Sequence, residues 1–153
     1  MRELEKAIAE RIVRRLLEAS GSTATVILKG SFPGGRMIGG KYSLATHTIT
    51  MYLTEIASQC VQLFGSDEQL AEYFEVVLAH ELGHAEDPCL AELAGSLEQH
   101  KTAMESARVA LLIEENAWSY AMKLLPHAEP AFVDRIIEHS LASYFKAIEQ
   151  APA

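Results

Sequence analysis

The sequence predicts an α+β domain with an N-terminal helix, a small and mostly antiparallel sheet, and then helices to the end. Between residues 23 and 53, β-branched and apolar residues alternate with polar ones around a glycine-rich segment, which is typical of short strands. Residues 3–19, and the chain beyond residue 53, instead repeat apolar residues at helical spacing. A chain of 153 residues can bury one core, so we expect residues 1–153 to form a single domain.

The composition is that of an ordinary globular protein, with 49% hydrophobic and 22% charged residues. A formal net charge of -8 argues against nucleic acid as a partner, because binding phosphate needs clustered basic residues. The basic residues Arg11, Arg14 and Arg15 lie among acidic ones, and we interpret them as a solvated helix face. Cys60 and Cys89 are too few for a disulfide framework. Without an apolar signal core or an 18-residue apolar run, we expect a cytoplasmic protein that does not bind membranes.

The first part of the chain supplies one helix and the sheet. Residues 3–19 are expected to form a helix that ends before Gly21. Residues 23–30 are predicted as a strand, and 42–53 as one or two more strands. The intervening residues 30–40 hold five of the nine glycines, so we expect a loop or hairpin tip there.

The rest of the chain is predicted to be helical. Ser66 and Gln69 fit a capping box, with Ser66 as the N-cap of the helix that follows. Pro126 and Pro130 separate the last two helical segments. The expected helices cover residues 54–64, 66–84, 90–125 (as one or two pieces) and 130–149.

The segment HELGH at residues 80–84 carries the chemistry. On a helix, His80 and His84 lie on one face about one turn apart, so both imidazoles can bind a single Zn²⁺. Glu81 lies about 100° around the helix. It can therefore reach a water molecule on the metal and act as its base. Short patterns of this kind also occur by chance, but the preceding apolar VVLA predicts a buried helix, where an unpaired cluster would be costly.

A third ligand is predicted on a later helix, where one acidic residue interrupts a face of small residues. Glutamate is almost never buried without a partner, so Glu114 on this face needs a cation or a metal. The alternatives are Glu115, at the edge of the same face, and an ion pair of Glu114 with a buried Arg or Lys. We find no such cation on a core face of the predicted helices. The face comprises Ala103, Ala107, Ala110, Glu114, Ala117 and Ala121.

Together, HELGH and the later EENAWSYAMKLLP (114–126) resemble the gluzincin metallopeptidases, most closely the ImmA/IrrE-like and minimal single-domain members. The second motif of that family runs roughly E-x-E-A-N-x-F-A and then L-L-x-P. Its first Glu, three residues before the Ala, is a zinc ligand and matches Glu114. Asn116 and Trp118 depart from that motif, and HAED follows the first motif where apolar residues are usual. The resemblance covers about 50 residues and implies a zincin-like fold.

The resemblance implies a zinc-dependent metalloendopeptidase with one Zn²⁺ per chain and a peptide or protein substrate. The metal would lower the pKa of its bound water toward ~7, and Glu81 would take the proton and pass it to the leaving amine. The family usually adds a Tyr or His that stabilises the oxyanion. Candidates here are Tyr73, Tyr120 and His127, whereas His139 is expected to be a surface residue.

Zincins bind their substrate as an added strand at a sheet edge. We expect residues 46–53 to receive it, because this is the last strand before the HELGH helix; the candidates there are Thr48, Ile49, Thr50, Met51 and Tyr52. An alternative to the enzyme is a zinc-binding peptide-recognition domain, or a latent site covered by residues 130–149 or by the acidic AEDP segment. A helical interaction protein without metal is a third possibility. The oligomeric state stays open.

Overall fold

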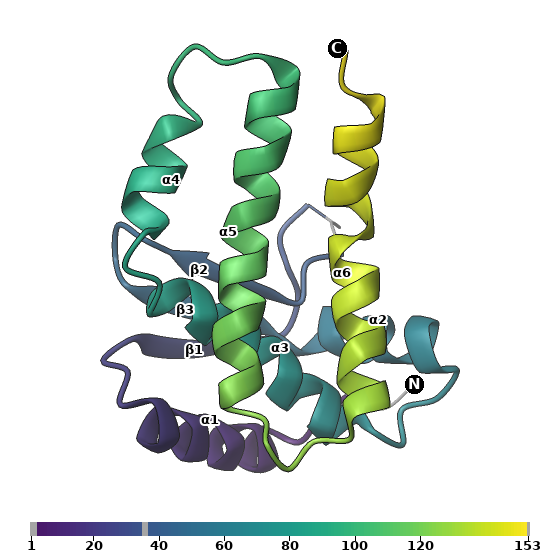
Figure 1. Ribbon diagram of the computed structural model, residues 1–153. Coiled ribbons are helices and arrows are strands. Elements are labelled where there is room, and N and C mark those ends of the chain that lie inside the picture. Colours follow the sequence, from purple (N-terminus) through teal and green to yellow (C-terminus); the bar gives the residue numbers. More distant parts are fainter. Residues whose placement is uncertain (1–2, 35–36, 153) are drawn as a thin grey trace.

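The computed structural model describes residues 3–34 and 37–152 and has the predicted α+β composition (Figure 1). Six helices and one three-stranded sheet make up this part of the chain. None of its helices combines the length and the apolarity that crossing a membrane requires. In chain order the elements are α1 (Lys6–Ser20), β1 (Thr25–Lys29), β2 (Gly40–Ser43), β3 (Thr48–Tyr52), α2 (Leu53–Phe64), α3 (Leu70–Ala85), α4 (Leu90–Ser96), α5 (Ala103–Lys123) and α6 (Pro130–Gln150).

The sheet is mixed, and the expectation of a mostly antiparallel sheet is wrong. Its strand order is β1-β3-β2, with β1 parallel and β2 antiparallel to β3. The next strand after β1 along the chain, β2, does not pair with β1. It forms the opposite edge of the sheet and leaves room for one strand between them. The tight turn back from β2 then inserts β3 between the other two strands. Strand β2 is therefore a free edge of the sheet.

The helix ends follow local chemistry, with one exception. Gly21 adopts φ 68° and its N–H bonds the carbonyl of Leu17, which ends α1 where the sequence predicts. The predicted capping box before α3 does not form. The N-cap is Gln69, and the hydroxyl of Ser66 accepts a bond from the Glu68 N–H (3.4 Å) within the preceding turn. Helix α3 consequently begins at Leu70.

Helix α3 is the central element of the core. It packs against α1, α2, α5, β2 and β3, so apolar side chains on several of its faces are buried. Phe74, Leu78 and Leu82 are among the fully buried residues. Because several faces of α3 are buried, its apolar residues are not confined to a single amphipathic stripe.

A buried carboxylate on α3 joins three parts of the chain. Glu75 is only 8% exposed. One of its oxygens pairs with the guanidinium of Arg15 on α1, and the other lies 2.6 Å from Nε2 of His127, in the turn after α5. Arg15 is thus a partner of the core and not simply part of a solvated face. The pairing satisfies a charge that would otherwise be costly to bury.

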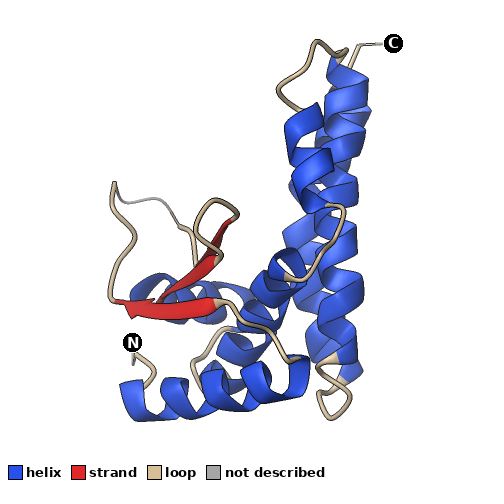
Figure 2. Ribbon diagram, turned by 90° about the vertical axis from the view of Figure 1, so that its left-hand side faces the viewer, coloured by secondary structure: helices blue, strands red, loops and turns tan. Residues whose placement is uncertain are grey.

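Helices α5 and α6 form an antiparallel pair, with α4 beside α5, that stands up from the body of the molecule as a column (Figure 2). Burial along the alanine face of α5 increases toward the base of the column. Ala117 and Ala121 are fully buried where α5 meets α3, Ala107 and Ala110 are half-buried, and Ala103 is exposed at the far end. The alanine face is therefore packed most tightly over its C-terminal half.

The closest approach of α3 and α5 occurs at Gly83. A Cβ atom on Gly83 would lie 2.1 Å from the carbonyl oxygen of Ala117, which is backbone and cannot rotate away. Only glycine fits between the two helices at this point. The HELGH segment therefore places its glycine where the packing of α5 requires one.

We predict that Gly83→Ala lowers the free energy of unfolding by about 1–3 kcal/mol, because it overpacks a helix crossing. Urea unfolding followed by circular dichroism measures the effect. Gly95→Ala in α4 is the matched control, since no atom lies within 4 Å of its added Cβ and helix propensity favours alanine. Equal stabilities of the two variants would contradict this account of the crossing.

Candidate metal centre

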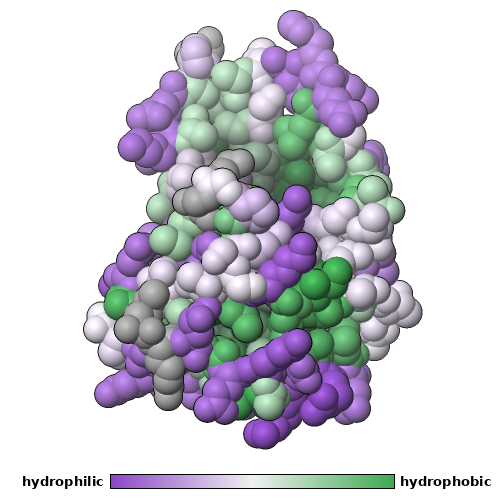
Figure 3. All heavy atoms as spheres, turned by 180° about the vertical axis from the view of Figure 1, so that it is seen from behind, coloured by the Kyte–Doolittle hydropathy of each residue, from purple (hydrophilic) through white to green (hydrophobic). Residues whose placement is uncertain are grey.

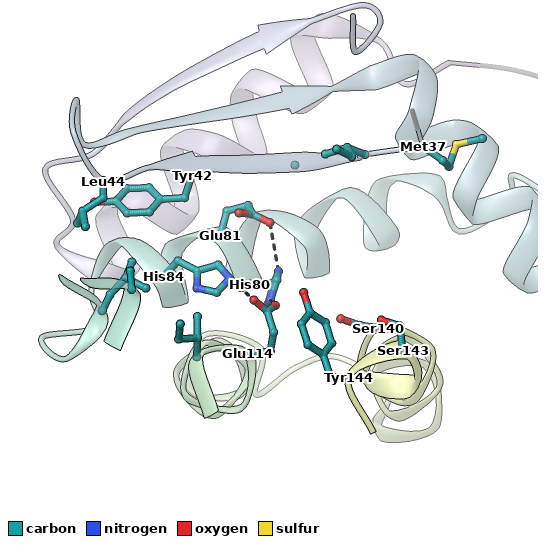
Figure 4. Close-up of a pocket in the computed structure, with 15 residues that line it drawn as sticks. Met37, Tyr42, Leu44, His80, Glu81, His84, Glu114, Ser140, Ser143 and Tyr144 are labelled. Atoms are coloured by element: carbon teal, nitrogen blue, oxygen red, sulfur yellow. Dashed lines mark hydrogen bonds and ion pairs between the residues drawn. The ribbon is translucent and has the colours of Figure 1, made fainter. Parts of the chain in front are cut away.

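Helices α3 and α5 bring the two predicted motif segments together. His80 and His84 project from one face of α3 toward Glu114 on α5 (Figure 4). Nε2 of His80 lies 2.9 Å from one carboxylate oxygen of Glu114, and Nε2 of His84 lies 3.3 Å from the other. The three side chains are 13%, 11% and 14% exposed, so the cluster is almost completely withdrawn from solvent.

These separations suit a single tetrahedral ion. Ligand atoms at zinc distances of 2.0–2.2 Å lie roughly 3.3 Å from one another. The two distances from the histidines to the Glu114 oxygens, 2.9 and 3.3 Å, are each near that spacing. Glu115, the alternative ligand, is exposed on α5, and no bond or ion pair joins it to either histidine among the described residues.

Glu81 lies on the other side of His80. Its Oε2 is 3.1 Å from Nδ1 of His80, and its side chain is 8% exposed. The ligand atoms of His80, Glu81 and His84 all fall within 4.8 Å of one another, so among the described residues these three are the group spaced to hold a metal ion in the structure as it stands. We favour the set with Glu114, because Glu114 contacts the same nitrogen, Nε2, of both histidines, whereas Glu81 contacts Nδ1 of one.

Strand β2 covers Glu81. A Cβ atom on Gly40 would lie 2.9 Å from Cγ of Glu81, so the absence of a side chain at this position leaves room for the carboxylate. The edge strand β2 and the side chain of Glu81 are therefore in close contact. Sequence reasoning assigned Gly40 only to a loop.

The protein environment couples the charges of the cluster. Burial by itself would lower the pKa of His80, but the Glu114 and Glu81 carboxylates raise it to about 9. Burial would likewise raise the pKa of Glu114, but the hydrogen bonds from His80 and His84 lower it to about 2. Carboxylates thus stabilise positive charge at this point of the structure. A divalent cation would replace the proton on His80 Nε2.

Trp118 contributes to the centre in a way that the sequence did not reveal. Its ring stacks on the imidazole of His80, with centroids 4.4 Å apart and planes at 24°. Its Nε1 donates a hydrogen bond to Oγ of Ser140 on α6 (3.2 Å). Trp118 therefore fixes the orientation of His80 and joins it to the neighbouring helix.

The cluster lies at the base of a cavity of about 620 Å³. The face of the molecule in Figure 3 is hollowed between α6 and α4, and hydrophobic surface borders the hollow. Helix α6 forms one wall and does not seal the cluster, and neither Glu86 nor Asp87 lines the cavity, so the two segments considered as covers do not fill it. The lining residues are Met37, Ile38, Gly40, Tyr42, Leu44, His80, Glu81, His84, Leu90, Ala94, Ile113, Glu114, Ser140, Ser143 and Tyr144.

Tyr144 on α6 is the tyrosine that faces the cluster. Its hydroxyl points into the space beside His80 and Glu114 (Figure 4). Burial, together with the negative charges of Glu114 and Glu81, raises the pKa of Tyr144, so it stays protonated and able to donate at neutral pH. Tyr144 was not among the oxyanion candidates from the sequence.

None of the three oxyanion candidates from the sequence lines the main cavity. Tyr73 is buried, and its hydroxyl donates to Gln59 (3.3 Å) beside a smaller cavity of about 190 Å³ behind His80. Tyr120 does not line the main cavity, and His127 pairs with Glu75. His139, expected at the surface, is exposed, although it borders the smaller cavity.

The expectation that residues 46–53 receive a substrate strand is wrong. Strand β3 is paired on both sides, with β1 and with β2, so its backbone has no free edge. The residues concerned are Thr48, Ile49, Thr50, Met51 and Tyr52, of which the second, fourth and fifth are buried. The free edge beside the cavity is β2, where Gly40 and Tyr42 line it.

The HAED departure from the family motif has a structural role. Glu86 accepts a hydrogen bond from the hydroxyl of Ser22 (2.8 Å). Asp87 accepts one from the N–H of Cys89 at the start of α4, and Nδ2 of Asn116 on α5 lies 3.5 Å from its other oxygen. The two acidic residues thus hold the end of α3 against its neighbours, and Asn116, which departs from the second motif, takes part.

No protein-family model, curated protein or solved structure matches the chain. The grounds for a function are therefore the geometry and chemistry of the cluster and of the cavity above it.

Proposed function

We propose that the protein is a zinc-dependent peptidase of the gluzincin kind that hydrolyses peptide bonds in an extended substrate. One observation carries the proposal. The Nε2 atoms of His80 and His84 converge on the two oxygens of Glu114 at the base of an accessible cavity, with Glu81 beside them.

The chemistry of the cluster favours a metal over a simple ion pair. Two carboxylates and two imidazoles are buried together, and among the described residues no Lys or Arg side chain lines the cavity. A divalent cation would balance both carboxylates at once, whereas one imidazolium balances only one. Three protein ligands also leave a fourth position open, which distinguishes a catalytic site from a structural one.

Each residue around the cluster would have a separate role in hydrolysis. When bound, Zn²⁺ at His80, His84 and Glu114 would supply Lewis acidity toward water and a carbonyl oxygen. Glu81 takes a proton from the attacking water and returns it to the leaving amine. Tyr144, which is protonated at neutral pH, donates a hydrogen bond to the oxygen that becomes negative. Nδ1 of His80 lies 3.1 Å from Oε2 of Glu81, and a proton held on Nδ1 would leave Nε2 as the nitrogen that binds the metal.

The edge strand offers a place for the substrate backbone. The unpaired side of β2 borders the cavity, so an extended peptide can add to the sheet beside Glu81. Glu81 packs over Gly40, where an added Cβ would lie 2.9 Å from its Cγ, so a peptide paired along β2 would pass close to Glu81. This arrangement supports an endopeptidase more than an enzyme acting on a small compact molecule.

We predict one zinc ion per chain in protein purified without added metal, and a loss of it in Glu114→Ala. Glu115→Ala is the matched control and should retain zinc, because Glu115 is exposed. Zinc is measured by mass spectrometry of the metal content. Trp118 is the only tryptophan and stacks on His80, so its fluorescence should also change as zinc is titrated into metal-free protein.

A zinc content far below one per chain that added zinc does not restore would refute the metal proposal. The cluster would then be an ion-pair network alone. Retention of zinc in Glu114→Ala together with its loss in the Glu115 variant would transfer the ligand role to Glu115.

We predict that Glu81→Gln lowers kcat for cleavage of a peptide library by at least about 100-fold while zinc content stays near one per chain. The amide preserves shape but cannot accept the proton. Cleavage products are identified by mass spectrometry. Equal activity of the two proteins would mean that the cleavage comes from a contaminant, and zinc binding without any cleavage would favour a peptide-recognition domain.

We predict that Tyr144→Phe lowers kcat by about 10–100-fold with little change in KM, because its hydroxyl acts mainly as charge develops. Tyr120→Phe is the control, since Tyr120 does not line the cavity. Steady-state kinetics on one cleaved peptide separate the two constants. A Tyr144 variant with unchanged kcat would assign oxyanion stabilisation to another group.

A further inference from the structure

The two ends of the cavity differ in chemistry. Figure 4 shows Leu44 and Tyr42 on the side of His84, and Met37, Tyr144 and the serines of α6 on the opposite side. The hydroxyl-bearing end carries Ser140, Ser143 and Tyr144. The end beside α4, here called the aliphatic end, consists of Leu44, Leu90, Ala94 and Ile113.

The described residues of these walls carry few charges outside the cluster. Apart from the tyrosines, the ionisable residues that line the cavity within the described part of the chain are those of the cluster itself: His80, Glu81, His84 and Glu114. A charged side chain entering the aliphatic end would lose water and meet only Leu90 and Ala94 from α4. An apolar side chain would instead cover Leu90 and Ile113, which are already largely buried, and Leu44, which is 48% exposed.

The size of the aliphatic end is set by a small residue. Ala94 faces the cavity from α4, where a larger side chain would occupy the space. Strand β2 supplies the matching spacing on the other wall, because Gly40, Tyr42 and Leu44 line the cavity at every second position. Alternate side chains of a peptide paired along β2 would enter at the same spacing.

We propose that the aliphatic end is a specificity pocket for a large apolar side chain, such as Leu or Phe, next to the bond that is cleaved. This inference rests on the proposed function and names its substrate class. The wall is held in place by bonds outside the cavity. Tyr42 O–H lies 2.8 Å from Nδ1 of His47, and Asp87 fixes the first turn of α4.

The test measures peptide binding to Glu81→Gln protein, so that it does not depend on turnover. Fluorescein-labelled seven-residue peptides that differ at one central position are titrated and followed by fluorescence anisotropy. Peptides with Leu or Phe should bind at least about tenfold more tightly than those with Ala, Lys or Glu. Adding Ala94→Phe should abolish this preference, whereas Ala91→Phe, on the exposed side of α4, should keep it.

A second variant guards against a folding defect in Ala94→Phe. Leu44→Ser lies at an exposed position after β2 and should weaken binding of the Leu and Phe peptides alone. Equal affinities for all five peptides, tighter binding of Lys or Glu, or a preference that both variants leave unchanged would overturn the pocket. Failure of the proposed function is a separate result, namely that wild-type protein does not cleave the peptide that its Glu81→Gln variant binds best.

Discussion

The crossing of α3 and α5 at Gly83 is the contact on which the rest of the structure depends. Because Gly83 has no side chain, the backbone of α5 at Ala117 packs directly against α3. Glu114 lies one helical turn before Ala117 on α5. The two histidines flank the same position on α3. A wider separation of the axes would break both contacts of Glu114 with them. The close packing of α3 on α5 and the assembly of the cluster thus depend on the same contact.

Short-range sequence patterns predicted much of the candidate site and most of the helices. The spacing of His80 and His84 and the single acid on an alanine face are short-range features, and the structure brings these residues together. The helix that ends before Gly21 and the helical second half were likewise predictable from periodicity. These features depend on residues within a few turns of one another, and neighbouring residues are what a sequence pattern describes directly.

The features that the sequence did not predict depend on contacts between segments that are far apart in the chain. Strand order depends on which distant segments meet, so alternation in residues 46–53 could not show that β3 lies in the middle of the sheet. Helix α6 extends past the core of the domain. Tyr144 lies on that part of α6, so its side chain faces the cavity instead of packed side chains. His127 looked available in sequence, yet the buried Glu75, 52 residues earlier, holds it.

Trp118 gives the cluster a mechanical connection to the wall of its own cavity. One face of the indole lies on His80 and its N–H reaches Ser140, so the imidazole and α6 share one rigid side chain. The ring of His80 at the base of the cavity and helix α6 in its wall are therefore connected through one side chain.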